Sequence, residues 1–502
     1  MTGLTTPQQV APGRQHTRPI ERVRGTHDLL HDDLERLEAT VGLLRGVAEQ
    51  HGFQFIQPPV LEHTELFLRK SGGERVAQLY AFDHRGRNLA LRPEFTASAM
   101  RVYIEHLQSE PLPVRLGYAG PVFRYEKPQA GRSRQFTDLG CELIGASGPV
   151  ADAEVIVLAV KGLEAAGVER PRLVLGHIGV VIDFLSGLDI DQRAQDWLTW
   201  SMERIRKGAN DAHDLPPHLA RFENALDGLD DLPGIDDGES LDVDAVADIL
   251  RQAGVRFDSG IRTAEEVVQG LFAKRRRRHD VELLREAAAF VTELTRLSGP
   301  PAEVLSPLRA LVVRQGLDAR PLDELERIIE LLAARGIDGS RVRIDLGMGR
   351  GLHYYTGMLF EAYGSEPRGQ QLCGGGRYDD LAQVLGTREA VPACGFSYGV
   401  ERVVAAGTSR AATRREPRAL VLQNGNPEQA MFLADELRER GWIAVIDLRE
   451  RNESATRRAA SRQGFDVIVS VDGDATRLFT VDTGEELVMP QPPSPAEVLR
   501  GQ

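Results

Sequence analysis

Residues 120–145 read GPVFRYEKPQAGRSRQFTDLGCELIG, and this stretch decides the fold. Residues 122–126 alternate apolar and polar side chains, residues 127–134 are rich in Pro, Gly and cations, and residues 136–144 alternate again. The pattern predicts two antiparallel strands around a polar loop. Arg124 on the first strand, beside the cations of the loop, is suited to hold phosphates through planar, charge-assisted hydrogen bonds. The alternative is a solvated surface turn, because most charged side chains are exposed.

A short segment upstream, residues 91–96, reads LRPEFT. The carboxylate of Glu94 lies next to a proline and is soon followed by Thr96, and both side chains can accept hydrogen bonds from a substrate ammonium group. Glu94 is equally suited to the first turn of a helix, since a negative charge stabilises the positive end of the helix dipole. The two roles are compatible.

Downstream, residues 345–363 read DLGMGRGLHYYTGMLFEAY. Glycines at this density let the backbone approach a ligand closely. Arg350 can meet a phosphate and Tyr355 can present its hydroxyl to a polar ring, but a glycine-rich hairpin with core aromatics explains the same pattern without a ligand. Two more segments read CGGGRYD at residues 373–379 and GFSYGVER at residues 395–402. The second is typical of a strand-to-helix junction, and neither is specific alone.

The composition is that of an ordinary globular protein with two or three domains: 502 residues, 42% apolar and 27% charged. The net charge of −13 argues against a broad nucleic-acid-coating surface and leaves room for a local basic groove. The three cysteines include no C-x-x-C pair, so the sequence predicts neither a zinc site nor a disulfide framework, and it favours a reducing cytoplasm. The sequence contains no run of about 18 apolar residues, so it predicts no membrane span.

The chain is predicted to consist of a core that is interrupted once and followed by a smaller domain. Changes in pattern and composition place the boundaries. The segments are a flexible tail (1–18), the first part of the core (19–184), a helical insertion (185–338), the second part of the core (339–406), a linker (407–417) and a small α/β domain (418–502).

Taken in order, these motifs resemble the histidyl-tRNA synthetase family, a class II aminoacyl-tRNA synthetase family. The resemblance covers about residues 20–180 and 340–405, with a looser likeness of 418–485 to the family's anticodon-binding domain. The matching segments are RGTHD at 24–28, motif 1 at 53–59, motif 2 at 115–145, the histidine segment RGLHYY at 350–355 and motif 3 at 395–402.

The resemblance implies an α+β fold, in which an antiparallel sheet is flanked by helices and carries a helical insertion and a small C-terminal α/β domain. It also implies a cytoplasmic homodimer. Its substrates are ATP with Mg²⁺, histidine and tRNA: histidine is first activated to histidyl-adenylate and then transferred to the tRNA. No metal ligand of the protein is predicted.

The family's functional residues carry over position by position. Arg124 and Arg350 are predicted to be catalytic, on either side of the α-phosphate. The predicted ATP contacts are Arg124, Glu126, Arg132 and Arg402. The predicted histidine contacts are Glu94, Thr96 and Asp138 around the ammonium group, and Glu142, Tyr355 and Tyr378 around the imidazole.

Two positions depart from the family, which has Gln at Asp138 and Asp at His353. They keep a second reading open, the regulatory subunit of ATP phosphoribosyltransferase, a paralogue that binds histidine without charging tRNA and whose partner is the catalytic subunit of that enzyme. Arg124, Arg350, Arg402 and the C-terminal domain favour the ligase, whereas Asp138, His353 and the net acidity favour the regulator. A third reading is a synthetase-like protein that binds neither tRNA nor the transferase.

Overall fold

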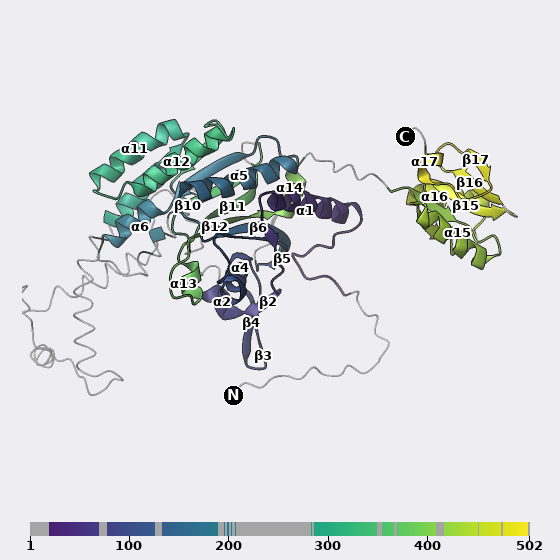
Figure 1. The fold of residues 1–502 in the computed structure, drawn as a ribbon, viewed down its shortest axis with the longest axis horizontal. Helices are drawn as coiled ribbons and strands as arrows, with labels where there is room; N and C mark the ends of the chain where they lie inside the picture. The colour runs from purple at the N-terminus through teal and green to yellow at the C-terminus, as the bar shows by residue number, and fades with distance from the viewer. Residues whose placement is uncertain are drawn as a thin grey trace, which may run out of the picture. The chain divides into compact units, whose positions relative to one another are not determined.

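The structure is a computed structural model, and it divides into two compact units, residues 1–409 and 410–502 (Figure 1). The predicted tail and most of the predicted insertion lie outside the residues that it describes, and the predicted domain boundaries stay predictions. The described ranges are 20–69, 78–125, 133–188, 286–348, 354–365, 369–407, 416–449, 451–472 and 475–499, with helical positions 195, 198, 199, 202, 206 and 283.

A nine-stranded sheet forms the centre of the first unit, and its order is β1-β5-β6-β12-β11-β10-β7-β9-β8. Neighbouring strands are antiparallel except for the pairs β1–β5 and β7–β9. This confirms the predicted α+β class. In sheet order the strands are β1 Gln54–Phe55, β5 Val114–Phe123, β6 Gln135–Ile144, β12 Ala393–Gly399, β11 Gln371–Arg377, β10 Met358–Tyr363, β7 Arg172–His177, β9 Val342–Asp345 and β8 Ser298–Gly299.

The predicted hairpin is the β5–β6 pair, and its first strand ends at Phe123, three residues before the predicted end at Glu126. Its strands pair from Val114–Ile144 to Phe123–Gln135. Arg124 therefore follows β5 rather than lying within it. Its backbone N–H still donates to the carbonyl of Arg134 at 2.9 Å, so the ladder geometry continues one residue further.

Helices cover one face of this sheet, where α1 (Asp32–Gln50), α5 (Pro149–Ala165) and α14 (Val400–Ala406) lie together in Figure 1. Helix α5 is apolar along most of its length, and it is therefore buried in the main core. Next to it pack α12 (Arg320–Ala334) and then α11 (Pro301–Arg314).

The opposite face of the sheet is approached by shorter elements. They are α2 (Thr64–Leu68), α4 (Thr96–Val102) with the π-helical turn Tyr103–Leu107, α13 (Leu381–Leu385) and a three-stranded sheet of β2 (Leu61–His63), β4 (Arg87–Leu91) and β3 (Tyr80–His84). Helix α6 (Gly179–Ser186) follows β7.

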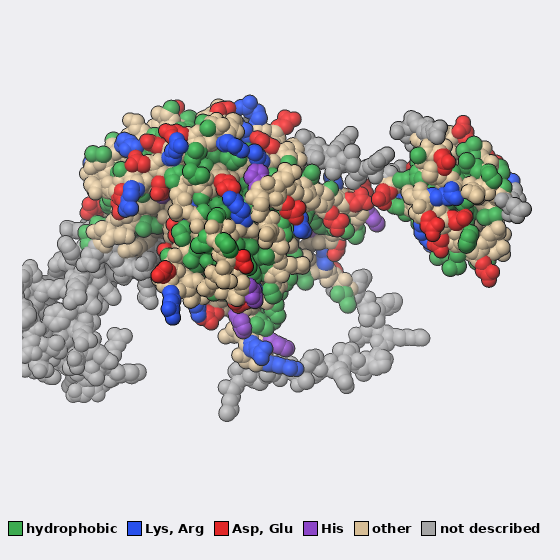
Figure 2. Space-filling model, in the orientation of Figure 1, with side chains coloured by type: hydrophobic (Ala, Val, Ile, Leu, Met, Phe, Trp, Pro, Cys, Tyr) green, Lys and Arg blue, Asp and Glu red, His purple; other side chains and the backbone are tan. Residues whose placement is uncertain are grey.

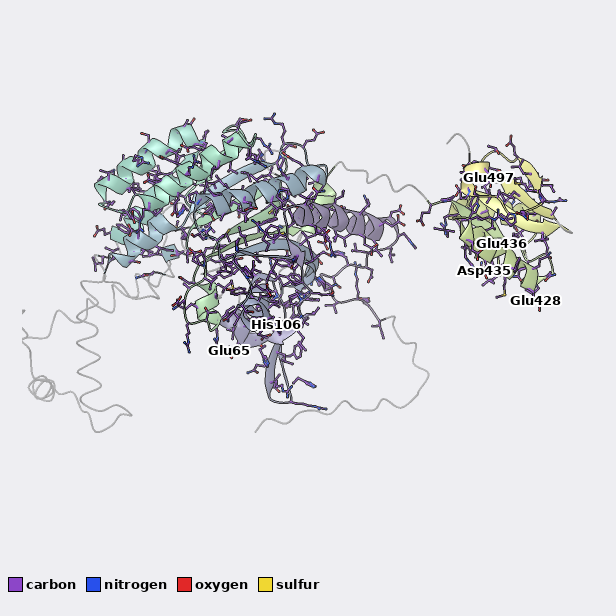
Figure 3. All side chains as sticks on the ribbon, viewed as in Figure 1. Glu65, His106, Glu428, Asp435, Glu436 and Glu497 are labelled. Atoms are coloured by element: carbon purple, nitrogen blue, oxygen red, sulfur yellow. The ribbon has the colours of Figure 1, made fainter. Side chains whose placement is uncertain are left out.

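The second unit is a mixed five-stranded sheet in the order β14-β13-β15-β16-β17, as the predicted small α/β domain requires. Its helix α15 presents Glu428, Asp435 and Glu436 (Figure 3). The elements are β13 Arg418–Val421, α15 Pro427–Glu439, β14 Ile443–Ile446, α16 Glu453–Gln463, β15 Val467–Asp472, β16 Ala475–Thr480, β17 Glu486–Met489 and α17 Pro495–Val498.

The surface carries both signs of charge. On the face shown in Figure 2, acidic and basic side chains are interspersed rather than gathered into one field. In the part of the chain that the structure describes, no helix has the length and apolar character needed to cross a membrane.

The register of β6 separates a packing face from a polar face. Leu139, Cys141 and Leu143 point into the helix-covered core. Because side chains alternate along a strand, Asp138 and Glu142 lie on the other face. Both carboxylates are buried nonetheless, at 3% and 1% exposure, so this polar face is an enclosed site and not solvated surface.

Candidate active site

Glu142 lies at the centre of the polar face and is held by three hydroxyl groups. The Thr96 Oγ1 and the Tyr118 hydroxyl donate to its Oε1 at 2.7 and 2.9 Å. The hydroxyl of Tyr378 donates to its Oε2. These donors come from α4, from β5 and from the residue after β11, so the carboxyl group joins three segments that are far apart in sequence.

Glycines on the neighbouring strands leave room for these side chains. Gly395 pairs with Glu142, and a methyl group added at Gly395 would lie 1.6 Å from Glu142 Oε2. A methyl group at Gly140 would lie 2.4 Å from the Tyr118 hydroxyl, and one at Gly376 would lie 2.8 Å from the ring of Tyr355. Only a residue without a side chain fits at these positions.

Burial raises the pKa of the Glu142 carboxyl to about 8, against the opposing effect of its three hydroxyl donors; the nearby charge of Glu94 raises it further. A carboxyl group that titrates near neutrality can either accept a hydrogen bond or donate one. A neutral imidazole carries one N–H donor and one nitrogen acceptor. The pocket thus offers a partner for either nitrogen of such a ring.

Glu94 has the helix-capping role that its sequence context allowed. Its carboxylate accepts hydrogen bonds from the backbone N–H groups of Thr96 and Ala97, the latter at 3.1 Å, at the start of α4. These donors would otherwise lack a partner within the helix. The cap fixes Glu94 beside Thr96, and therefore beside the carboxyl group that Thr96 holds.

Asp138 and Arg124 form the next part of the site. Burial raises the pKa of the Asp138 carboxyl to about 6, while the charge of Arg124 and a hydrogen bond from Ser397 oppose this rise. Arg124 Nε donates to the carbonyl of Pro93 at 2.8 Å, and its guanidinium lies 5.0 Å from the centre of the Phe136 ring. The cation is thereby held next to the carboxylates instead of extending into solvent.

The groups are arranged along β6. Asp138 and Glu142 are four residues apart on one face, which corresponds to about 13 Å of extended strand. Arg124 follows Phe123, the partner of Gln135, and helix α14 with Arg402 follows Gly399, the partner of Asp138. The arginines thus flank one end of β6, and the Glu142 pocket lies nearer the other.

The structure brings together most of the predicted residues that it describes. Glu94, Thr96, Asp138, Glu142, Tyr378 and Arg124 form the connected group above. The Tyr355 ring lies 6.4 Å from that of Tyr378, and Arg402 Nη1 donates to the carbonyl of Gln371 at 3.1 Å. Glu126, Arg132, Arg350 and His353 lie outside the described residues.

Sequence reasoning missed two members of this group, Tyr118 and Ser397. Tyr118 donates to Glu142 and stacks on Phe95 with 4.4 Å between ring centres. Its position opposite Gly140 was the available signal. That signal becomes readable only once the register of the β5–β6 hairpin is known.

Gly395→Ala tests how tightly this face is built. The added methyl group must displace Glu142, so the histidine affinity that the family resemblance implies should fall about 10- to 100-fold, the cost of leaving a buried polar group without its partner. Histidine binding by calorimetry measures this. Gly42→Ala, where an added methyl group meets nothing within 4 Å, is the matched control and should bind as the parent does. Equal affinity in the two variants would show that ligand binding does not use Glu142.

Fold and site together define the class of protein. An antiparallel sheet has helices on one face and, on the other, two enclosed carboxylates with Arg124 beside them; this is the catalytic unit of a class II aminoacyl-tRNA synthetase. A family model described as histidyl-tRNA synthetase matches residues 25–215 and 240–403. The chain belongs to the histidyl-tRNA synthetase family.

Relatives agree with this assignment. The histidine–tRNA ligase of Archaeoglobus fulgidus is 32% identical over 94% of this chain and 97% of its own length. That of Methanocaldococcus jannaschii is 30% identical over 90% and 92%.

An apo histidyl-tRNA synthetase of S. aureus superimposes with a TM-score of 0.60 at 22% identity, covering 94% and 97% of the two chains. A Bacillus halodurans protein described as an ATP phosphoribosyltransferase regulatory subunit/histidyl-tRNA synthetase gives a TM-score of 0.62 at 23% identity, covering 91% and 99%. These likenesses support the fold.

Proposed function

We propose that this chain is a histidine–tRNA ligase, which activates histidine with ATP to histidyl-adenylate and then transfers the histidyl group to tRNA. The observation that carries the proposal is the buried Glu142 carboxyl with its three hydroxyl donors. Relatives named histidine–tRNA ligase match the chain over nine-tenths of its length, so the C-terminal unit is included in the likeness.

The histidine imidazole is proposed to lie against Glu142, Tyr355 and Tyr378. A site with buried polar groups rejects a side chain that leaves those groups without partners, which gives selectivity for a ring bearing both a donor and an acceptor. Glu94, Thr96 and Asp138 are proposed to receive the ammonium group. Asp138 in place of the family's Gln keeps an acceptor at that position and adds a negative charge, which Arg124 offsets.

The reacting phosphate is proposed to lie at the arginine-flanked end of β6. A carboxylate oxygen of histidine attacks the α-phosphorus, the bond to the bridging oxygen breaks, and pyrophosphate leaves. Arg124 and Arg350 are proposed to stabilise the charge on the α-phosphate, while Glu126, Arg132 and Arg402 contact the rest of the ATP. Such a step needs positioned charge more than it needs a protein acid or base.

Mg²⁺ is proposed to enter with ATP. Mg²⁺ is commonly bound by phosphate oxygens with one or two carboxylates, so a dedicated protein cage is not required. Glu401 fits this role, because its buried Oε2 has no hydrogen-bond partner among the described residues while its Oε1 accepts from the N–H of Thr137 at 2.7 Å. When bound, the ion neutralises charge on the outgoing pyrophosphate.

ATP–pyrophosphate exchange and tRNA charging test the proposal together. We expect exchange that requires histidine, and charging of tRNA that carries the histidine anticodon. Histidine binding without either activity would overturn the proposal and favour the regulatory reading, in which Asp138 and His353 have changed the pocket from a catalytic site to a sensor. Absence of histidine binding would leave the third reading, a synthetase-like protein.

We further propose that the chain acts as a homodimer. The first unit exposes large apolar side chains close to the segment similar to motif 1: Val60, Leu61, Phe82 and Leu112 are 37%, 44%, 46% and 53% exposed. A second copy would cover apolar surface of this kind. Light scattering is expected to give twice the monomer mass, and a monomer at micromolar concentration would contradict the proposal.

A further inference from the structure

Residues 23–26, at the start of the segment RGTHD, pack against the end of the hairpin where β5 ends and β6 begins. They form a turn, in which the carbonyl of Val23 accepts hydrogen bonds from the N–H and the hydroxyl of Thr26 at 3.1 and 2.7 Å. Between these two residues lie Arg24 and Gly25, whose carbonyls face the neighbouring chain. None of the roles predicted from the family resemblance falls on this turn.

Both of these carbonyls accept hydrogen bonds from residues that lead into β6. The carbonyl of Gly25 accepts from the backbone N–H of Arg134 at 2.7 Å and from the Ser133 hydroxyl at 2.9 Å. The carbonyl of Arg24 accepts from Arg134 Nη1 at 3.0 Å. These partners lie 108 to 110 residues apart in the chain. The turn therefore fixes both the backbone and the side chain of Arg134.

A glycine is required at the centre of this contact. Gly25 has φ +86°, a backbone conformation that residues with a side chain rarely adopt. A methyl group added there would lie 2.9 Å from Cδ and 3.1 Å from Cγ of Arg134. Any side chain at residue 25 thus strains the turn and pushes Arg134 from its place.

Arg134 in turn holds the end of β5. Its carbonyl accepts from the N–H of Arg124 at 2.9 Å, and its guanidinium lies 4.3 Å from the centre of the Tyr125 ring, where a cation is attracted to the aromatic face. Tyr125 is also held by the segment that leads into β3. Its N–H donates to the carbonyl of Gln78 at 2.8 Å, and its ring meets that of Tyr80 edge-on at 5.7 Å.

The position of Arg124 thus depends on two anchors. One holds its side chain, whose Nε donates to the carbonyl of Pro93. The other holds its backbone, through Arg134 and the turn that carries Gly25. A shift of about 1 Å in a catalytic group can cost on the order of 10²-fold in rate. Loss of the second anchor should therefore affect the chemistry.

We propose that the turn at residues 23–26 is a positioning element of the adenylation site, which acts through Arg134 on the backbone of Arg124. The proposal rests on the proposed function, because that function assigns Arg124 to the α-phosphate. It gives the segment RGTHD a defined task, in which Gly25 provides the contact and Arg134 transmits it. Neither of these two residues is expected to touch histidine or ATP.

Gly25→Ala and Gly336→Ala form a matched pair for the test. Gly336 has φ +82°, so both substitutions strain the backbone alike, but a methyl group at Gly336 meets nothing within 4 Å. In histidine-dependent ATP–pyrophosphate exchange without tRNA, Gly25→Ala is expected to lower kcat about 10- to 100-fold and to leave KM for histidine near the parent value. Gly336→Ala should keep the parental kcat. A kcat for Gly25→Ala within twofold of that for Gly336→Ala would overturn the proposal.

Repeating Gly25→Ala in an Arg124→Ala protein identifies the route. If the turn acts through Arg124, the substitution should lower kcat no further once that side chain is absent, because positions that act through one group are not additive. Losses that multiply would contradict the proposal, since a general weakening of the fold lowers activity whichever residue occupies position 124.

Arg134→Met tests the second link and guards against a glycine variant that does not fold. It removes the cation from the Tyr125 ring and the hydrogen bond to the turn, so a fall in kcat of similar size is expected. Arg45→Met is its control and should keep the parental kcat, because Arg45 also lies over an aromatic ring, that of Phe55 at 4.6 Å. An equal loss in the two variants would count against the proposal and refute the route through Arg134.

The exchange assay omits tRNA so that a role at the tRNA can be told apart. Parental exchange in Gly25→Ala and Arg134→Met, with a loss confined to tRNA charging, would overturn the proposal and assign the turn to tRNA binding. A parent protein without exchange activity would instead refute the proposed function.

Discussion

Replacing Glu142 with Gln is expected to lower kcat/KM for histidine in ATP–pyrophosphate exchange by about 10²- to 10³-fold, because a buried site built around specific hydrogen bonds loses most of its selectivity when one partner is exchanged. The amide has the size of the carboxyl group but cannot gain or lose a proton. It also brings an NH₂ group where the three hydroxyls of Thr96, Tyr118 and Tyr378 now donate, so at least one of them loses its acceptor.

The loss should appear in histidine binding and leave ATP affinity nearly unchanged, since Glu142 lies at the end of β6 away from the arginines. Glu105→Gln is the matched control, because that side chain is half exposed and pairs with Arg101 on the outside of the π-helical turn. A Glu142→Gln enzyme with normal KM for histidine would contradict the placement of the amino acid.

The same variant should change how stability depends on pH. The ordinary pKa of this carboxyl is 4.5, and burial raises it to about 8 in the folded protein. Between these values the folded state holds a proton that the unfolded state has lost, so the free energy of unfolding falls as pH rises from about 5 to 8. Glu142→Gln lacks this titration. Urea unfolding at pH 5.5 and pH 8 should therefore favour the variant, relative to the parent, more at the higher pH.

Local patterns predicted the elements that carry the site. The alternation around residues 120–145 is enough for a hairpin, because the period of two follows from strand geometry. Helix α1 is readable in the same way, because Leu34, Leu37, Val41 and Leu44 recur at helical spacing, and it ends at Gln50, two residues before Gly52. The family resemblance then located Glu142 and Asp138 on one strand, and alternation places them on one face.

Features that depend on register or distant pairing were not predictable. Tyr118 reaches Glu142 only because β5 pairs with β6 in one particular register. Arg377 is neutralised inside the protein by Asp152, 225 residues away in the chain, at 2.9 Å. The spacing of charged residues along the sequence does not predict such pairs.

Very short elements were also missed. Strand β8, Ser298–Gly299, lies within the range predicted to be helical, and two residues are too few to show a period. The proline-rich end of the chain is a second case. Helix α17 forms there at Pro495–Val498 with a capping box at Ser494, and the indole N–H of Trp442 donates to the carbonyl of Pro493 at 2.7 Å.

Arg92 and Arg124 differ in what their donors meet. The Arg92 guanidinium donates hydrogen bonds to the carbonyls of Pro58, Pro59 and Pro121, and burial lowers its pKa. Its Nε and Nη1 thereby hold the loop before α4 in place. Among its described contacts Arg124 commits only Nε to a carbonyl, that of Pro93, which orients the outer edge of the guanidinium toward the carboxylate-lined face.

Arg124→Ala should therefore have the largest effect on chemistry, a fall in kcat for ATP–pyrophosphate exchange on the order of 10³-fold, as is typical when one preorganised donor to a developing charge is removed. Arg124→Lys keeps the positive charge near Asp138 but loses the planar fork, so a loss of about 10²-fold is expected. Arg87→Ala, an exposed arginine on β4, is the control and should retain parental kcat.

Histidine binding without ATP separates the role of Arg124 at the phosphate from its effect on Asp138. Removing the cation takes away an influence that lowers the pKa of Asp138, so in Arg124→Ala this carboxyl should hold its proton to higher pH than in the parent. Histidine affinity should then fall only near and below neutral pH, and Arg124→Lys should restore it. The loss of kcat should persist at pH 8, where Asp138 is ionised again. If raising the pH restored kcat in Arg124→Ala, Arg124 would act only by keeping Asp138 charged, and the α-phosphate would have to be assigned to another cation.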